Sequence, residues 1–325
     1  MPADATTRIL PVRTWESADI PLIEVSSKHA GPTINVLGGL GGTAYPGIET
    51  CRILAKRLCT MDIRGRIRLL PVVDVAGFFD RASHFSPLAS RPIAEAFGSA
   101  TSETEMSGAD EVVQVVSNTL EHTDFHVDVR GGELTEFHGH WVAIPHAEAA
   151  SQKIAVQMAQ ICGADVRVAI GDEDPPGIHP GVAGVMAAQG IPSAILSYGG
   201  GSHDVTMHAD ILVQDVLRIL TALGAIDGIG IAQAAPNNLV GPRIWGHTAH
   251  HDALWVPHTS AGSYVKSNEV LGHLWDYFGN PLEEVVAPFD GYVMTVTTSM
   301  AVQAAPLPDG DPWFAQTALI AATHS

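Results

Sequence analysis

The sequence has few positive charges, few cysteines and no long apolar run. Lys and Arg total 17 against 35 Asp and Glu, which gives a formal net charge of −18. Nucleic acids and anionic membrane surfaces are bound through clusters of Lys and Arg, so this balance argues against both as partners. No run reaches the ~18 apolar residues of a membrane span, and the first residues lack the pattern of a signal peptide. We therefore expect a cytoplasmic protein.

The cysteines also carry little information about a site. Cys51, Cys59 and Cys162 are an odd number, widely spaced in a long chain. This pattern is neither a disulfide framework nor a zinc knuckle, so a reducing compartment is expected. Hydrophobic residues make up 46% of the 325 positions, enough for a large core.

Short β-branched runs alternate with segments of helical periodicity over the first two thirds of the chain. This alternation predicts an α/β sheet covered by helices on both faces, with ligands bound at the edge where the strands end. The predicted strands are 33–39, 66–73, 124–130, 165–170 and 193–197, and the predicted helices are 47–60, 109–121, 148–162, 180–189 and 204–222.

The pattern changes near residue 224. Residues 224–241 are rich in Gly, Pro and Asn and have no helical period, which is typical of a linker. Short β-type runs with turn signals follow. We therefore predict an α/β domain over 1–223, a linker over 224–241 and a smaller all-β domain over 242–325.

Two segments at predicted strand ends could carry chemistry. The glycine-rich segment 38–47 matches neither a Walker loop nor a dinucleotide fingerprint, so a tight strand-to-helix turn is the better interpretation. In DFHVDVRGGE, side-chain alternation places His126, Asp128 and Arg130 on one face, with Arg130 at the sheet edge. Arg130 suits bidentate binding of a carboxylate; the alternative is an ion pair with Asp128, Glu133 or another acidic neighbour.

Histidine is abundant, with 16 residues, but its spacing is not diagnostic. His138 and His140 could point one way on a strand, and His250 and His251 are adjacent, yet no third ligand follows at a characteristic spacing. Surface or hydrogen-bonded histidines are the simpler interpretation. Ser197 ends an apolar strand, but it lacks the Gly-x-Ser-x-Gly elbow of a nucleophile.

Several segments together resemble the succinylglutamate desuccinylase/aspartoacylase family, including its diaminobutyrate deacetylase-like branch. The resemblance covers nearly the whole chain. It is carried by HAGPTINVLGGLGGTAYPG, LLPVVDVAGFFDR, FSPLASRPIAEAFGS, VDVRGG, GIPSAILSYGGGS and SAGSYVKSNEVLGHLWDYFGNPLEEVVAPFDGYV. It implies a zinc-carboxypeptidase-like mixed sheet and a smaller C-terminal barrel-like β domain, on which the family hydrolyses N-acyl amino acids.

The resemblance also implies that the family's chemistry is altered. The positions matched to its zinc ligands are Gly41, Ala44 and Arg130, none of which is an ordinary zinc ligand. The position matched to its general base is Ser197. Its substrate-binding Asn-Arg pair is matched to Ala94 and Glu95. No cofactor is therefore expected at the family position.

Three hypotheses follow. The favoured one is a metal-independent enzyme acting on a small carboxylate-bearing, amino-acid-like molecule. It is favoured because a new cluster of charged residues, as well as Gly and Ala, replaces the family's zinc ligands. The second is a non-catalytic relative that binds a ligand or an active paralogue, and a homo-oligomer is equally open. The third is a metallohydrolase whose zinc has moved to His126, His138, His140 or another residue that the resemblance does not match. For the first, the candidate catalytic residues are Arg130, Glu133, Glu95 and His126, and the candidate substrate-binding residues are Arg81, Arg130, Asp74, Tyr198 and Ser197.

Overall fold

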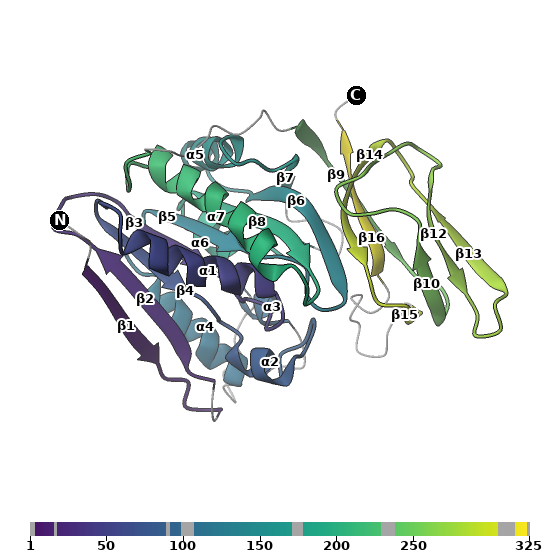
Figure 1. The fold of residues 1–325 in the computed structure, drawn as a ribbon, viewed down its shortest axis with the longest axis horizontal. Helices are drawn as coiled ribbons and strands as arrows, with labels where there is room; N and C mark the ends of the chain where they lie inside the picture. The colour runs from purple at the N-terminus through teal and green to yellow at the C-terminus, as the bar shows by residue number, and fades with distance from the viewer. Residues whose placement is uncertain are drawn as a thin grey trace.

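The computed structural model describes residues 4–15, 18–88, 92–98, 107–170, 178–228, 238–304 and 316–323. An α/β part and a β part lie side by side, with the N-terminal strands at the far end of the α/β part (Figure 1). No helix of the described chain is both long and apolar enough to cross a membrane.

A twelve-stranded mixed sheet runs through both parts, in the order β1-β2-β4-β3-β5-β8-β6-β7-β9-β16-β14-β11. Its centre is parallel where β4, β3, β5 and β8 neighbour one another, and β6 joins β8 in the antiparallel direction. The strand bounds are β1 Asp4–Leu10, β2 Ile20–Ser26, β3 Thr33–Leu37, β4 Arg66–Leu70, β5 Phe125–Val129, β6 Glu136–Pro145, β7 Val166–Ile170, β8 Ser193–Gly200, β9 Asn238–Thr248, β11 Tyr264–Val265, β14 Gly291–Thr297 and β16 Gln316–Thr323.

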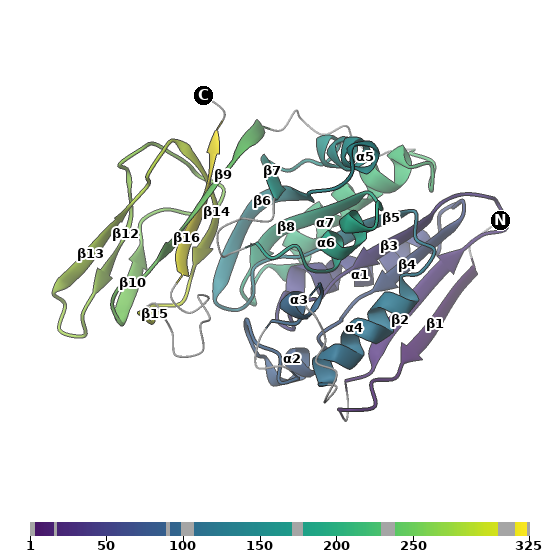
Figure 2. The same ribbon diagram turned by 180° about the vertical axis from the view of Figure 1, so that it is seen from behind.

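Helices cover both faces of the parallel region, as the sequence predicts. Side chains of α1, α5 and α7 form one apolar core with the sheet, while α3, α4 and α6 contribute to a second core. The helices α1 and α7 lie in front of the sheet in Figure 1, and α4 and α6 lie in front of it in the opposite view of Figure 2. The bounds are α1 Tyr45–Leu58, α2 Val75–Asp80, α3 Ile93–Ala96, α4 Gly108–Thr119, α5 Ala149–Gln160, α6 Gly181–Ala188 and α7 Val205–Ala222. The mixed α/β fold class is therefore confirmed.

The sequence did not predict β1, β2 or β6. In β6, EFHGHWVAIP, polar residues interrupt the apolar ones, so no strand pattern stands out. Tertiary contacts stabilise it instead, because it pairs with β8, β7 and β14. Neighbours distant in sequence thus override the weak local signal.

The C-terminal part contains a second, antiparallel sheet in the order β13-β12-β10-β15. It packs on β14 and β16 around a core that includes Trp255, Leu274 and Ile320. Its strands are β10 Ala253–Pro257, β12 Val270–Trp275, β13 Pro281–Val286 and β15 Ala301–Val302. Within the predicted 224–241 linker, residues 229–237 lie outside the described residues, and β9 begins at Asn238.

The two parts also share a sheet. The pairing of β7 with β9 and of β6 with β14 makes the C-terminal strands a continuation of the large sheet. A mixed apolar cluster crosses this junction, with Trp141 and Ile195 on one side and Met294 and Leu319 on the other.

Candidate active site

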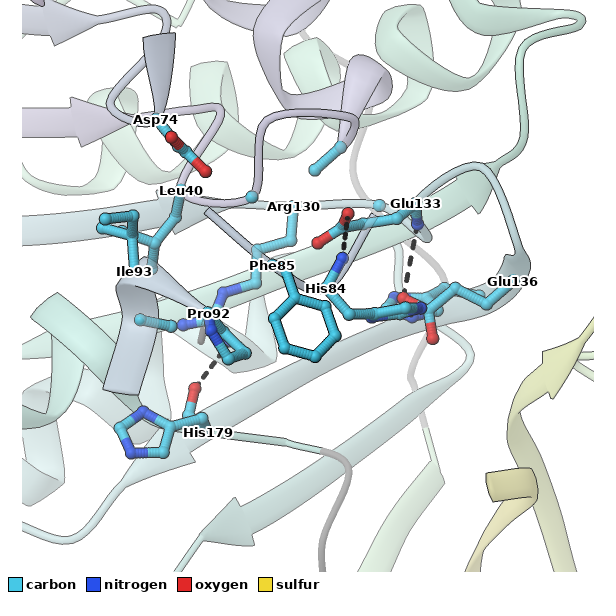
Figure 3. A pocket seen from close by; sticks show the side chains of 15 residues that line it. Leu40, Asp74, His84, Phe85, Pro92, Ile93, Arg130, Glu133, Glu136 and His179 are labelled. Atoms are coloured by element: carbon cyan, nitrogen blue, oxygen red, sulfur yellow. Dashed lines mark hydrogen bonds and ion pairs between the residues drawn. The ribbon is translucent and has the colours of Figure 1, made fainter. Parts of the chain in front are cut away.

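A cleft opens where the parallel strands end (Figure 3). The loop after β3 supplies Gly41 and Ala44, and the turn after β5 supplies Arg130, Gly131 and Glu133. Carboxyl ends of parallel strands meet at one edge of a sheet, where α/β proteins bind ligands. The cleft is therefore in the position that the strand pattern predicts.

All three positions matched to zinc ligands line this cleft, but their side chains do not fit a zinc ion. Gly41 and Ala44 have no donor atom, and Arg130 is a cation. A Cβ atom added to Gly41 would lie 2.2 Å from Oε1 of Glu133. The Glu133 carboxylate thus occupies the space in which a side chain at position 41 would begin.

Arg130 is held against the sheet by an ion pair with Asp128. Its Nη2 and Nε lie 2.6 and 3.0 Å from Oδ2 of Asp128. Nη1 donates to the carbonyl of His179 at 2.7 Å, and Nη2 lies 3.4 Å from that of Pro180. Period-two alternation puts residues 128 and 130 on the same face, so the strand itself makes this pair. Asp128, and not Glu95, Glu133 or Asp74, is the anionic partner.

Glu133 lies at the wall of the cleft, and its carboxylate is fixed by two donors. Its Oε2 accepts hydrogen bonds from the Thr43 hydroxyl at 2.7 Å and from the backbone N–H of His84 at 2.8 Å. Burial raises the pKa of Glu133, although the charge of His84 and the Thr43 bond oppose the shift. The raised pKa favours the protonated form of Glu133, which can donate a proton.

Glu136 and His138 form a hydrogen-bonded chain with Ser197. Nε2 of His138 lies 3.0 Å from Oε1 of Glu136, and Nδ1 lies 2.6 Å from the Ser197 hydroxyl. Burial by itself would raise the pKa of Glu136, but the charge and hydrogen bond of His138 outweigh burial and lower the pKa to about 2. Glu136 is therefore ionised at neutral pH.

Asp74 is a third carboxylate in the cleft. It caps α2, where Oδ1 accepts from the backbone N–H of Gly77 at 2.9 Å and from the Ser86 hydroxyl at 2.8 Å. Burial raises the pKa of Asp74 to about 6, against the effect of both hydrogen bonds.

A second cavity adjoins the cleft and shares His84 and Glu136 with it. Its other walls carry uncharged polar groups of the C-terminal part, including Thr297, Ser299 and Gln316. Both parts of the molecule therefore contribute to the space around Glu136.

Comparison with known proteins then places the fold. No family model and no curated protein matches the sequence. A succinylglutamate desuccinylase/aspartoacylase from Rhodobacter sphaeroides superposes with a TM-score of 0.81 at 20% identity, over 99% of this chain and 96% of that one. The ectoine utilization protein EutE from Ruegeria pomeroyi gives 0.80 at 19% identity, over 99% of both chains. An aspartoacylase family protein from Mesorhizobium loti gives 0.77 at 16% identity, over 100% and 96%.

The chain has the succinylglutamate desuccinylase/aspartoacylase fold. This agreement extends across both parts of the molecule, because nearly the whole of each chain is covered. On this fold, the cleft that holds Glu133 and Glu136 lies at the positions that the sequence resemblance matches to the zinc site.

The three histidines proposed as relocated zinc ligands do not converge on this fold. His126 is completely buried in the sheet, and burial lowers its pKa to about 4. His138 lines the cleft, whereas Nε2 of His140 lies 2.6 Å from Oδ2 of Asp215 on α7. An irregularity in the β6–β8 register between His138 and Trp141 breaks the alternation that would have put both histidines on one face. The described structure therefore does not bring these three histidines together, and a relocated zinc site stays a prediction.

Several other candidates lie outside the cleft lining. Arg81 ends α2 in the left-handed conformation and is exposed, and Glu95 lies on α3 beside the lining residue Ala94. Tyr198 packs against the rings of His140 and His208. Ser197 is fully buried behind His138.

Sequence reasoning missed His84 and Glu136. His84 lies in the loop after α2, a left-handed residue with φ of 64°, and nothing in its local sequence marks it. Glu136 and His138 are two residues apart, a spacing that puts both on one face of a strand. That signal could have been found if β6 had been predicted as a strand.

Proposed function

We propose that this chain is a divergent member of the succinylglutamate desuccinylase/aspartoacylase family that acts on a small amino-acid-like molecule without the family's zinc. The observation that supports this proposal is the convergence of Glu133, Glu136 and His138 on one cleft, with Glu133 filling the space beside Gly41. General acid and general base catalysis by these side chains would then replace catalysis by the metal ion.

The two glutamates suit opposite roles. Glu133 has a raised pKa and Glu136 a lowered one, although they are neighbours in one site. Carboxyl groups whose pKa values are pushed apart in this way serve as general acid and general base. We assign Glu133 as the acid and the ionised carboxylate of Glu136 as the base, with Nε2 of His138 holding that carboxylate and the Ser197 hydroxyl orienting the imidazole.

The charges of the cleft fit both ends of an amino-acid-like molecule. Asp74 and Glu136 are carboxylates of the lining that suit an ammonium group. A guanidinium has five N–H donors, and the bonds of Arg130 to Asp128, His179 and Pro180 engage four of them. Within the described ranges the remaining N–H, on Nη1, has no hydrogen-bond acceptor, and we assign it to the carboxylate of the ligand.

The test is a turnover screen of N-acyl amino acids and related amines by the full chain after exhaustive chelation. Activity should survive chelation. Glu133→Gln and Glu136→Gln should each lower kcat by about 10²–10⁴-fold, the range for loss of general acid or base catalysis. Glu284→Gln, on the exposed strand β13, is the matched control and should keep full activity.

Two results would contradict the proposal. Ligand binding without turnover in the wild type would favour the non-catalytic hypothesis. Turnover that chelation abolishes and zinc restores, while the chelated chain stays folded, would favour a metal-dependent hydrolase. The pH profile adds a further check, since activity should fall as pH rises through the pKa of Glu133, and Glu133→Gln should remove that limb.

A further inference from the structure

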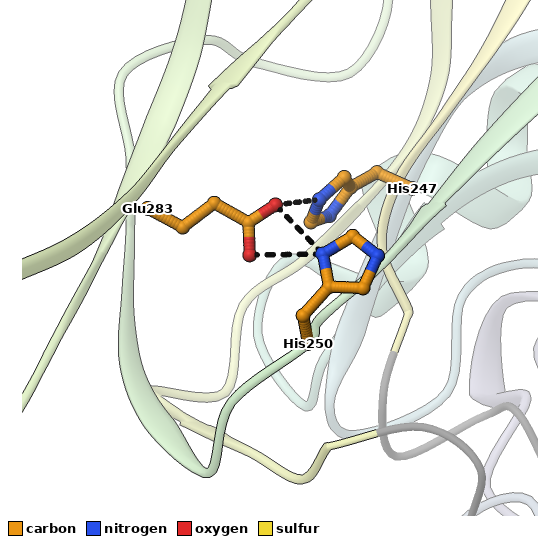
Figure 4. A group of neighbouring side chains, drawn as sticks. All are labelled: His247, His250 and Glu283. Carbon is orange, nitrogen blue, oxygen red and sulfur yellow. Dashed lines mark hydrogen bonds and ion pairs between the residues drawn. The ribbon is translucent and has the colours of Figure 1, made fainter.

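A second group of histidine and carboxylate side chains lies in the C-terminal part, outside the cleft (Figure 4). His247 is near the end of β9, His250 is in the turn that follows, and Glu283 is on β13. Each offers one ligand atom, and these atoms all lie within 4.8 Å of one another. Among the described residues, no other group of three His, Cys, Asp or Glu meets this criterion.

The contacts show which atoms face one another. Nε2 of His247 lies 2.8 Å from Oε1 of Glu283. Nδ1 of His250 lies 3.2 and 3.3 Å from the two oxygens of the same carboxylate. Two imidazole nitrogens thus converge on one carboxylate, as Figure 4 shows.

The buried histidine is already oriented by a partner behind it. His247 is 8% exposed, and its Nδ1 lies 2.8 Å from the hydroxyl of Thr317, which is fully buried on β16. Metal-binding histidines characteristically use the second ring nitrogen in such a bond, which fixes the ring and its tautomer. In the metal-free chain, Nε2–H of His247 donates to Glu283. With a metal ion bound, the ring proton would lie on Nδ1 with the Thr317 hydroxyl as its acceptor, which leaves the Nε2 lone pair for the metal.

We propose that His247, His250 and Glu283 form a binding site for one divalent transition-metal ion. Two imidazoles and a carboxylate suit zinc and related ions, whereas calcium and magnesium prefer oxygen ligands alone. Three protein ligands leave a coordination position for water.

The position of the site indicates what the ion would do. β9 belongs to the large sheet, where His247 is opposite Ala318 of β16. β13 is an edge strand of the four-stranded sheet. A metal ion bound by both strands would cross-link the two sheets. The role is therefore stabilisation of the C-terminal part, independent of the cleft.

The experiment measures zinc binding to the full metal-stripped chain by calorimetry, with cobalt absorption as a report on the ligands. One ion should bind per chain and raise the Tm. His250→Ala should keep the fold, because that side chain is 72% exposed, but it should weaken binding at least 10-fold. Glu283→Gln should do the same, and Thr317→Val should weaken binding by about 10–100-fold through the orientation of His247.

The matched controls are His273→Ala and Glu284→Gln, which break a comparable imidazole–carboxylate pair on neighbouring strands. Both should bind zinc as the wild type does. Equal zinc binding by the wild type and His250→Ala, or equal weakening by His273→Ala, would overturn the proposal. Activity of the cleft is not part of this readout, so failure of the metal site and failure of the proposed function are distinguishable.

Discussion

Gly41 shapes the cleft because it has no side chain. Gly41 leaves room for the Glu133 carboxylate, which then reaches the Thr43 hydroxyl and the His84 backbone. A side chain at position 41 and this conformation of Glu133 exclude one another.

Gly41→Ala should therefore disrupt the site through Glu133. The new Cβ would lie 2.2 Å from Oε1, so the carboxylate has to move and the Thr43 bond breaks. We expect a stability loss of about 1–3 kcal/mol, the usual cost of overpacking. In a Glu133→Ala background the same substitution should be nearly neutral. Urea unfolding of the wild type, both single variants and the double variant measures the coupling between positions 41 and 133. If the two stability losses simply add, Gly41→Ala does not act through Glu133.

Asp74 should give the protein a distinctive pH dependence. Its pKa is raised from 3.8 to about 6, so the folded protein binds more protons than the unfolded chain between these values. The free energy of unfolding then falls as pH rises through this window, by up to about 3 kcal/mol at ~1.4 kcal/mol per pKa unit. Asp74→Asn should remove this loss, because an amide oxygen still accepts from Gly77 and Ser86.

Urea unfolding at pH 4 and pH 7 checks the prediction. The difference in stability between Asp74→Asn and the wild type should grow toward pH 7. Asp80→Asn, at the exposed end of the same helix, should leave the wild-type slope nearly unchanged. A pH-independent difference for Asp74→Asn would show that Asp74 titrates normally.

At the scale of elements, β6 and α7 are joined by a buried polar contact. Asp215 of α7 is fully buried and accepts from Nε2 of His140 at 2.6 Å, from Arg218 at 2.7 Å and from the backbone of Gly163 at 2.6 Å. These bonds hold His140 on the helix side of β6 and leave His138 to the cleft.

Asp215→Ala should therefore be strongly destabilising. Removing one partner of a buried ion pair costs about 3–5 kcal/mol, and Asp215 also accepts the hydrogen bonds of His140 and Gly163. Asp210→Ala, on the same helix, breaks a solvent-exposed pair with Arg57 and should cost less than about 1 kcal/mol. Thermal unfolding of both variants gives the comparison, and similar costs would contradict the assignment.

At the scale of the whole molecule, the α/β and β parts share one sheet and one apolar cluster. The large sheet is continuous through β7–β9 and β6–β14, and the cluster around Trp141, Ile195, Met294 and Leu319 belongs to both parts. The second cavity also draws its lining from both. We therefore expect the parts to unfold together.

Met294→Ala tests this expectation. Met294 is 1% exposed, and truncating a buried methionine costs about 2–5 kcal/mol. Differential scanning calorimetry should show a single transition shifted to lower temperature. Met300→Ala, at a side chain 58% exposed, should leave the Tm unchanged. Two transitions, of which only one moves, would indicate independent parts.

Most of the fold could be predicted from local pattern, but much of the site could not. The alternation of strands and helices in the first two thirds has strong periodicity, so β3, α1, β5 and α7 were predicted close to their observed bounds. β6 has weak periodicity and was missed, and with it Glu136. The distinction between His138 and His140 depends on a register irregularity, which no local pattern encodes.

The sequence by itself determined the α/β architecture, the β-rich C-terminal part and the absence of donor atoms at Gly41 and Ala44, because periodicity and residue type are local properties. Only the tertiary structure decided that Arg130 pairs with Asp128, that Glu133 enters the space beside Gly41, and that His247, His250 and Glu283 meet. Each of these contacts depends on the direction of side chains from separate turns or strands. The packing of the backbone fixes the direction of these side chains. Composition and spacing therefore could not predict the contacts.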